Sequence, residues 1–548
     1  MVDFPDKDKK FDTALVYDEL LMRHWNHWNT REKSHLFTLN ITPSGAASGQ
    51  PKDLLKGTNL ESPVEYTGGP FDYVVSPDGK WVSFGAKKPG RDKSWETEQN
   101  IHLVSFDGSG AIADLTQDNQ GASTHPLFSP CGKYLTWFQM KRRGYEADRN
   151  DIILFDLEKK VKREIANDWD RSPSSNLWSL DSKSLLLTAV DEAKTKLFRV
   201  DIESGKVTKF DTPNSVSTVS QVDSNNLLLL ISSFGHPNEM FTLADKDTLL
   251  LTISSFGHPN DIYSIGVDGK NLNQLTDANS EKLKGIYLAE PEEFWFTGAL
   301  GDNVQGWLLK PINFDPSKKY PVAVIIHGGP QSSYKDRYFQ YHNFNLHASA
   351  GQAVVSINYH GSKGFGQNFT DSVNKNYETY PVEDHYKGLD HLIKKYSWID
   401  GDRVCTAGTS MGGYYGNWFN GHTKRFKCFI QGDGDFDLKQ DYFTTDELWF
   451  AEYDSGGSPM DPKAKYDESN PANFVGNWTT PTLVVHNQKD YRVDLSAGLA
   501  TFTALQRQGV PSRFLYFPDE SHGVSKPANL IRFMNETVGW VTKWTSKH

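Results

Sequence analysis

The chain has 548 residues, of which 37% are hydrophobic and 13% aromatic, and its formal net charge at pH 7 is −11. This length exceeds what one hydrophobic core usually supports, so at least two domains are expected. The acidic balance, without a cluster of Lys and Arg, argues against nucleic acid as a partner. The longest apolar run, Leu227 to Ile231, is far shorter than the roughly 20 residues that a membrane span needs.

The amino-terminal residues and the cysteines bear on the cellular compartment. The chain begins Met-Val-Asp-Phe-Pro-Asp-Lys, which is not an apolar leader. Its three cysteines, Cys131, Cys405 and Cys428, make no disulfide framework. The chain as given therefore indicates a cytoplasmic protein, whereas a signal peptide in a missing amino-terminal segment would indicate a secreted one.

Short strands and turns fill residues 1–285. The turn-and-strand stretch at 76–82 is echoed at 129–135 and again at 179–185, a period of about 50 residues. One four-stranded blade per repeat is the natural interpretation, so the sequence predicts a β-propeller of five or six blades, with an irregular β-sandwich as the alternative. The octapeptide Ile-Ser-Ser-Phe-Gly-His-Pro-Asn stands at 231–238 and again at 253–260, which indicates a local duplication without a predicted function.

Residues 286–548 follow a different pattern, in which apolar strands alternate with helices. Such alternation predicts a mostly parallel sheet covered by helices on both faces. One helix is expected within 495–506, where four apolar residues recur at helical spacing. The predicted strands are 321–326, 353–358, 403–408, 426–431, 481–487 and 512–518.

A serine stands between one of these strands and a helix, in the sequence Gly408-Thr-Ser410-Met-Gly412-Gly. Glycines two residues to either side of Ser410 lack a Cβ, so strand and helix can approach closely and hold the hydroxyl outward on a strained turn. This is the nucleophile elbow of an α/β-hydrolase, and it predicts Ser410 as a covalent nucleophile. An ordinary strand-to-helix turn is the alternative.

Serine needs a base within hydrogen-bond reach and a carboxylate that orients that base. In α/β-hydrolases the chain order is Ser, acid, His, with each on a loop after a strand. Asp490 follows the strand at 481–487 and is the candidate acid, with Asp494 as its rival. His522 follows the last predicted strand and is the candidate base. Ser410, Asp490 and His522 are therefore the predicted catalytic triad.

A tetrahedral intermediate also needs hydrogen-bond donors for its oxyanion. The backbone N–H of Met411, next to the nucleophile, is one candidate, and the His327-Gly328-Gly329-Pro loop after the first parallel strand supplies the other. A plain turn is the alternative for this loop. His327 is expected to pack beneath the loop, and this chemistry calls for no metal and no cofactor.

The propeller, the His-Gly-Gly-Pro loop, the Gly-x-Ser-x-Gly-Gly elbow, Asp-Tyr-Arg-Val and the final histidine together resemble the prolyl oligopeptidase family of serine peptidases. The resemblance covers nearly the whole chain, and it is closer still to the fungal dipeptidyl-peptidases of that family. In the family the Arg-His-Trp segment normally lies well inside the chain, so the propeller looks incomplete at its amino end. The stretches that carry the closer resemblance are 23–25, 166–172, 328–333, 509–515 and 517–520.

The resemblance also implies a substrate pocket beside the nucleophile. Arg492 matches the position that contacts a substrate carbonyl, for which its fork of donors is suited. An aromatic stretch at 447–453 resembles a segment that forms walls of the pocket, and ordinary core packing is the alternative. The implied wall residues are Trp449, Phe450, Tyr453 and Tyr414.

The sequence thus predicts a serine peptidase that hydrolyses short peptides through an acyl-enzyme and, by resemblance, releases amino-terminal dipeptides. The family's propeller caps the active site and limits substrates to short peptides. A carboxylesterase or acyl hydrolase with the same triad, and a catalytically disabled binding protein, are the alternatives. The expected partners are short peptides, with neither nucleic acid nor a membrane, and no residue stands out as an anchor for a substrate amino terminus.

Overall fold

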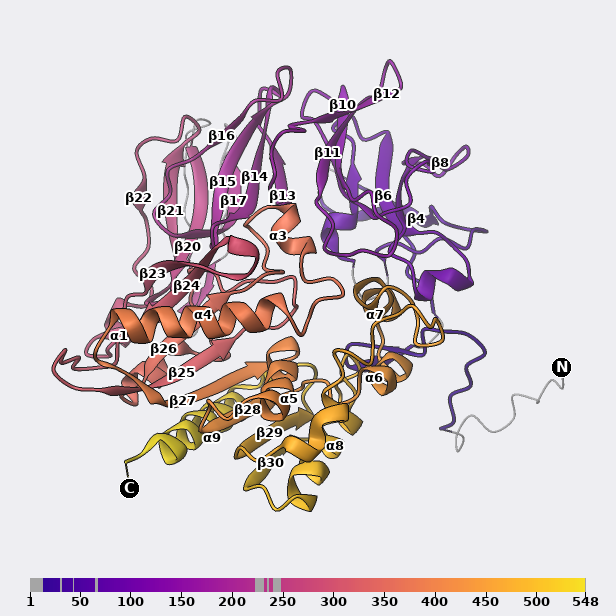
Figure 1. The fold of residues 1–548 in the computed structure, drawn as a ribbon. Coiled ribbons are helices and arrows are strands. Elements are labelled where there is room, and N and C mark those ends of the chain that lie inside the picture. Colours follow the sequence, from indigo (N-terminus) through magenta and orange to yellow (C-terminus); the bar gives the residue numbers. More distant parts are fainter. Residues whose placement is uncertain are drawn as a thin grey trace.

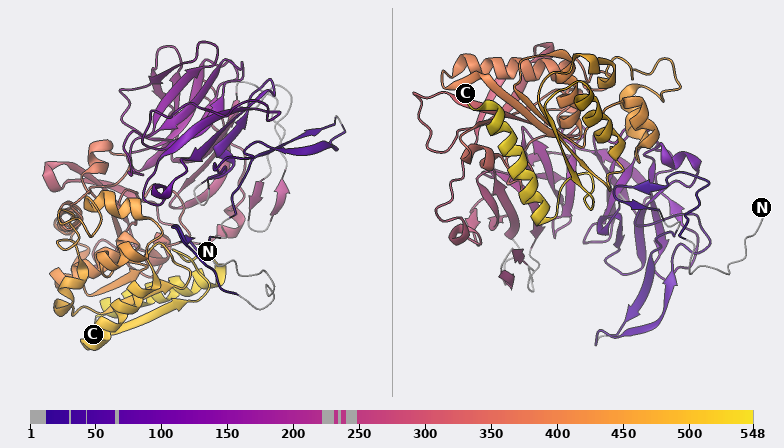
Figure 2. Two further views of the ribbon diagram at one scale, coloured as in Figure 1. Left: turned by 90° about the vertical axis from the view of Figure 1, so that its right-hand side faces the viewer. Right: turned by 90° about the horizontal axis from the view of Figure 1, so that it is seen from below.

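The computed structural model describes residues 13–29, 32–42, 44–64, 68–221, 231–233, 236–239 and 248–547. Antiparallel sheets from the first half of the chain form one layer, and a mostly parallel sheet with its helices forms a second layer beneath it (Figure 1; Figure 2, left). The arrangement confirms the predicted propeller-type half followed by an α/β-hydrolase.

Four four-stranded antiparallel sheets stand side by side in chain order, as the blades of a propeller do (Figure 1). Strand β9 packs against the first blade, β13 against β9, and β17 against the third blade. Their strands are β5 (Tyr73–Val75), β6 (Trp81–Lys87), β7 (Gln99–Ser105) and β8 (Ala113–Asp114); β9 (Ser123–Phe128), β10 (Tyr134–Gln139), β11 (Asp151–Asp156) and β12 (Val161–Ile165); β13 (Pro173–Trp178), β14 (Ser184–Asp191), β15 (Lys194–Asp201) and β16 (Val207–Lys209); and β17 (Ser215–Gln221), β20 (Thr248–Ser255), β21 (His258–Gly266) and β22 (Asn273–Gln274).

The sequence repeat corresponds to one recurring turn. In each copy a serine hydroxyl accepts a hydrogen bond from the backbone N–H five residues later. The distances from Ser76, Ser129 and Ser179 are 2.9, 3.0 and 3.0 Å. Each turn leads into the second strand of its blade, which explains why the repeat was visible in the sequence.

The described residues form four complete blades, fewer than the five or six that the repeat length predicts. Earlier in the chain they form two separate hairpins instead, β1 (Arg23–His24) with β2 (His27–Trp28), and β3 (Phe37–Ile41) with β4 (Ala47–Asp53). The estimate was too high because it counted this segment as blades.

Both copies of the duplicated octapeptide form a hairpin with the same pairing. In the first copy β18 (Ile231–Ser233) pairs with β19 (His236–Glu239), with Ile231 opposite Glu239. In the second copy Ile253 lies opposite Asp261 in the β20–β21 hairpin. Part of the first copy, at 234–235, lies outside the described residues.

The hydrolase half is built on an eight-stranded sheet in the order β23-β24-β26-β25-β27-β28-β29-β30. The pairs β23–β24 and β24–β26 are antiparallel, and the other neighbours are parallel. The strands are β23 (Glu292–Thr297), β24 (Asn303–Leu309), β25 (Tyr320–Ile326), β26 (Ala353–Asn358), β27 (Ile399–Thr409), β28 (Cys428–Gly432), β29 (Thr482–Asn487) and β30 (Ser512–Phe517). The expected boundary at residue 285 lies between β22 and β23.

Helices cover both faces of this sheet because its central strands are apolar on both sides. α4 and α5 pack on one face, while α2 and the long carboxy-terminal α9, the yellow helix beside the C label in the right panel of Figure 2, pack on the other. The helices are α1 (Ser280–Leu283), α2 (Phe344–Ser349), α3 (Gln367–Asp371), α4 (Tyr380–Lys395), α5 (Met411–His422), α6 (Leu438–Thr444), α7 (Leu448–Ser455), α8 (Leu495–Arg507) and α9 (Pro527–Thr545). Among the described helices, none is both long enough and apolar enough to cross a bilayer.

Two of the three cysteines form a single disulfide, which the sequence analysis did not anticipate. Cys405 and Cys428 are paired residues on the adjacent strands β27 and β28, with their Cα atoms 4.8 Å apart, and they form a disulfide. Cys131 is free and exposed. Strand register, which the spacing of the cysteines does not reveal, brings the two sulfurs together.

Candidate active site

Ser410 lies on the sharp turn between β27 and α5, where its backbone φ is 62°. Its N–H donates to the carbonyl of Gly432 over 2.9 Å. A Cβ on Gly413 would stand 2.3 Å from that same carbonyl oxygen, and a Cβ on Gly408 would stand 2.6 Å from the backbone of Gly412. A Cβ on Gly412 would likewise stand 2.4 Å from the carbonyl oxygen of Ile326. Backbone contact therefore requires Gly408 and Gly412, the two glycines of the predicted elbow, and Gly413 as well.

This contact predicts that alanine at position 413 of α5 destabilises the protein, whereas alanine at position 416 of the same helix does not. In Gly413→Ala the new methyl group would collide with backbone, whereas in Gly416→Ala its nearest atom is 3.6 Å away, an ordinary contact. We expect G413A to lower both the melting temperature and fluorophosphonate labelling of Ser410. G416A should be neutral or slightly stabilising, since Ala is favoured over Gly in helices by roughly 0.5–1 kcal/mol. Equal melting temperatures for the two variants would contradict this account of the elbow.

The base and the acid candidates meet on loops at the same edge of the sheet. His522 Nδ1–H donates to Oδ2 of Asp490 over 2.7 Å, and Asp490 is fully buried. The other oxygen of Asp490 accepts the backbone N–H groups of Arg492 and Val493, each at 3.0 Å. The rival Asp494 instead caps α8 and pairs with an arginine. The structure thus brings His522 to Asp490 rather than to Asp494.

Ser410 and His522 line one cavity of about 360 Å³. Met411, Gly328 and Gly329, the predicted oxyanion donors, line it too. A Cβ on Gly328 would lie 3.2 Å from the Cβ of Ser410, so the loop passes directly beside the nucleophile. The cavity therefore brings together the predicted nucleophile, the predicted base and the backbone groups predicted to stabilise a tetrahedral intermediate.

His327 lies beneath the Gly328–Gly329 loop, as expected. Its Nδ1–H donates to the carbonyl of Gly328 over 2.7 Å, and its Nε2 is 2.9 Å from the hydroxyl of Ser362. Burial lowers the pKa of His327 to about 4, so the ring is neutral at physiological pH. It stacks on Tyr359 with ring centroids 4.2 Å apart, which gives it a packing role.

A second layer of polar residues supports the triad. Asn487 donates both to Asp433, at 3.0 Å, and to the carbonyl of Ser521, at 2.7 Å, next to His522. Asp433, His486 and Asp490 lie close enough together to be considered as metal ligands. However, Nε2–H of His486 donates to a backbone carbonyl over 2.9 Å, so this nitrogen has no lone pair for a metal. Burial and the nearby Asp490 raise the pKa of Asp433, and we assign the group to hydrogen-bonded support.

Two of the five predicted pocket residues, Arg492 and Phe450, line the cavity. The other three do not. Tyr414 is fully buried in the core, with its hydroxyl donating to the carbonyl of Ser469 over 2.8 Å. Tyr453 stacks on Tyr145 of the second blade, and Trp449 donates its indole N–H to Glu146. A single sequence does not reveal which face of a short helix meets substrate, so these aromatic residues were placed in the pocket in error.

Arg492 is held by two carboxylates. Its Nε donates to Asp446 over 2.9 Å, and its Nη1 donates to Glu447. Burial and the nearby carboxylate of Glu146 raise the pKa of Glu447. The guanidinium is therefore fixed in the cavity wall by groups that the sequence did not single out.

Trp25 is a cavity residue that the sequence analysis missed. Its ring lies over the guanidinium of Arg492, 4.3 Å from the centroid, and 6.1 Å from the ring of His522. Its N–H donates to Asp446 over 2.5 Å, and its carbonyl accepts the N–H of Tyr491 over 3.0 Å. The Arg-His-Trp motif was noticed but assigned to the propeller, whereas this hairpin lies against the hydrolase loops.

We predict that Trp25→Ala raises the KM for peptide substrates. Losing the ring over Arg492 removes a cation–π contact and a wall of the cavity, worth about 1 kcal/mol, or roughly fivefold. Trp28→Ala is the matched control, because Trp28 lies on the same hairpin but bonds to the hydroxyl of Tyr491 outside the cavity. Steady-state kinetics of both variants provide the measurement, and an equal rise in KM for both would contradict a direct role for Trp25.

Glu146 is the second cavity residue that the sequence did not identify. It lies between β10 and β11 of the second blade, so it reaches the cavity from the propeller side. Glu146 is exposed as a residue, and its carboxylate accepts the indole N–H of Trp449 over 2.9 Å. The cavity therefore has the predicted nucleophile contributed by the hydrolase domain and a carboxylate contributed by a blade.

The fold and the arrangement of Ser410, His522 and Asp490 are those of an α/β-hydrolase that carries propeller blades. Residues 337–548 match the Prolyl oligopeptidase family. The chain is 35% identical over 542 residues to dipeptidyl-peptidase 5 of Schizosaccharomyces pombe, covering 97% of this chain and 75% of that protein. It is also 35% identical over 558 residues to a probable dipeptidyl-peptidase 5 of Arthroderma benhamiae, covering 97% and 73%.

Among solved structures, the acylaminoacyl peptidase of Pyrococcus horikoshii superposes with a TM-score of 0.77 and 19% identity, covering 98% of this chain and 79% of that one. That likeness concerns the fold. The chain is 35% identical to the two dipeptidyl-peptidases over most of their length and its own. It therefore belongs to the prolyl oligopeptidase family.

Proposed function

We propose that the protein is a serine peptidase that releases dipeptides from the free amino terminus of short peptides. Three lines support the proposal: the family, the arrangement of Ser410, His522 and Asp490, and the fungal relatives named dipeptidyl-peptidase 5. The observation that carries the preference for an amino terminus is the carboxylate of Glu146 in the same cavity as Ser410.

The reaction would follow the acyl-enzyme route. Ser410 Oγ attacks the scissile carbonyl while His522 Nε2 takes its proton, and Asp490 keeps the imidazole in the tautomer that allows this. The N–H of Met411 and the Gly328–Gly329 loop stabilise the oxyanion. His522 then protonates the leaving amine, and a water activated by the same histidine hydrolyses the ester to release the dipeptide.

Glu146 is proposed to bind the substrate ammonium. An exposed carboxylate attracts a cation, and a charge-assisted hydrogen bond to it contributes about 1.5–3 kcal/mol. The indole N–H of Trp449 occupies one oxygen and so orients the carboxylate. The nearby Glu447 already accepts a bond from Arg492, and burial raises its pKa, so Glu146 is the carboxylate proposed to supply the charge. An acylated amino terminus would have no positive charge to offer this group.

This anchor separates the proposal from its alternatives. An acylaminoacyl peptidase or a carboxylesterase uses the same triad but gains nothing from a carboxylate in the cavity wall. A disabled binding protein would leave Ser410 unreactive, although the bond from His522 to Asp490 is formed.

We predict that Glu146→Gln lowers kcat/KM for dipeptidyl-aminocoumarin substrates by about tenfold to a hundredfold, through the lost charge-assisted bond. The rate of fluorophosphonate labelling at Ser410 should not change, since that probe has no amine. Glu158→Gln is the control, because Glu158 is an exposed carboxylate on the same blade outside the cavity.

Ser410→Ala should abolish both turnover and labelling. Dipeptide turnover that persists in S410A would overturn the triad. If E146Q leaves kcat/KM unchanged, or if N-acetylated substrates are cleaved as fast as free ones by the wild type, the amine anchor is wrong.

A further inference from the structure

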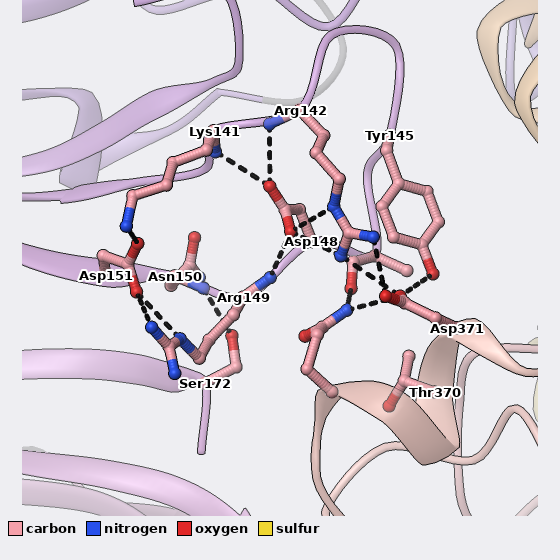
Figure 3. A network of polar contacts seen from close by, with 12 residues as sticks. Lys141, Arg142, Tyr145, Asp148, Arg149, Asn150, Asp151, Ser172, Thr370 and Asp371 are labelled. Atoms are coloured by element: carbon pink, nitrogen blue, oxygen red, sulfur yellow. Dashed lines mark hydrogen bonds and ion pairs between the residues drawn. The ribbon is translucent and has the colours of Figure 1, made fainter. Parts of the chain in front are cut away.

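The segment that carries Glu146 is folded around one buried carboxylate. We call residues 140–150, between β10 and β11, the anchor loop. Asp148 accepts the backbone N–H groups of Lys141 and Arg142, each at 2.8 Å, and of Arg149 at 3.0 Å (Figure 3). Asp148 also accepts a hydrogen bond from Nε–H of Arg142 over 2.7 Å. The loop is thus a compact unit whose position depends on what holds it from outside.

An interdomain contact holds the anchor loop against the hydrolase helix α3. Arg142 donates from Nη1 to Oδ2 of Asp371 over 2.6 Å, and from Nη2 to Oδ1 over 3.1 Å (Figure 3). The hydroxyl of Tyr145 donates to Oδ1 of Asp371 over 2.9 Å. A bidentate arginine–carboxylate pair fixes orientation as well as distance. We call these three residues the clamp.

The residues on both sides of Glu146 contact the hydrolase domain. Tyr145 stacks on Tyr453 of α7, with ring centroids 4.0 Å apart. The carbonyl of Ala147 accepts a bond from Gln367 over 3.1 Å, and the same amide donates to Asp371 over 2.7 Å. Glu146 is therefore held on either flank by groups that converge on α3 and α7.

We propose that Asp371 is a positioning residue for specificity: by clamping the anchor loop, it sets the distance between Glu146 and Ser410 and so the length of peptide released. The inference rests on the proposed function of Glu146. The anchor belongs to a blade and the nucleophile to the hydrolase sheet, so contacts between the two halves must define their separation. Glu146 itself accepts the indole N–H of Trp449 on α7, and the clamp and the stacked tyrosines hold the residues beside it in the loop.

If the clamp only stabilised the fold, breaking it would impair folding and the triad together; a positioning role leaves both intact. The arginine and the aspartate are both partly exposed, and such pairs contribute little to global stability. Loosening the clamp should therefore leave the fold and the triad intact while Glu146 shifts. A displacement of about 1 Å of a substrate-positioning group can cost up to a hundredfold in rate.

The test uses Asp371→Asn in the full-length chain, which keeps the shape of the side chain and removes its charge. We expect kcat/KM for dipeptidyl-aminocoumarin substrates to fall between about fivefold and a hundredfold, mostly through KM. Fluorophosphonate labelling of Ser410 should stay within about twofold, because the probe bypasses the anchor. Asp390→Asn is the matched control, because Asp390 lies on the hydrolase helix α4 and pairs with Arg425. This variant should change neither kcat/KM nor the labelling rate.

A double-mutant cycle then links the clamp to Glu146. In the Glu146→Gln background, D371N should cost little more, because the anchor it positions is already disabled. Asp371→Glu should recover part of the lost activity. If D371N lowers labelling and peptide turnover equally, or if its effect adds fully to that of E146Q, the positioning role is overturned. If E146Q lowers turnover and D371N does not, the clamp fails while the proposed function stands.

Discussion

The position of the nucleophile depends on one backbone contact, the approach of Gly413 to the carbonyl of Gly432. Because no side chain separates α5 from β28 at this point, Ser410 is held on a strained turn above the sheet. The loops after β25, β29 and β30 end at the same edge, since parallel strands carry their carboxyl ends together. Asp490, His522 and the Gly328–Gly329 loop are therefore brought around Ser410 by strand order alone.

The rest of the cavity has a different origin, because it is closed by segments that precede the hydrolase domain. Trp25 enters from an amino-terminal hairpin and Glu146 from the second blade. Neither is connected to the triad by local chain geometry, so their places depend on contacts between folding units. The hairpin is held by Asp446 and Tyr491, and the anchor loop by Asp371. The hydrolase domain thus supplies the predicted catalytic residues, while the proposed selection of substrate depends on the hairpin and the blade loop that pack against it.

This division explains how much the sequence could predict. The elbow and the blade turns are local motifs within one strand–turn unit, and the chain order of this fold places the predicted Asp490 and His522 on the loops after β29 and β30. The sequence already favoured Asp490 over Asp494, and the structure adds that Asp494 is the cap of α8. Trp25 and Glu146 could not be found, because proximity across hundreds of residues leaves no periodic signal. Tyr414 and Tyr453 were misplaced because aromatic residues serve cores and interfaces as readily as pockets.

The central claim is that the cavity measures a peptide from its free amino terminus to the bond that Ser410 attacks. Mass spectrometry of the products from a short peptide, with a free and with an acetylated amino terminus, tests it most directly. We expect dipeptides to leave one after another from the free peptide, and the acetylated peptide to remain intact. Release of single residues or tripeptides, or internal cleavage of the acetylated peptide at a comparable rate, would contradict the account.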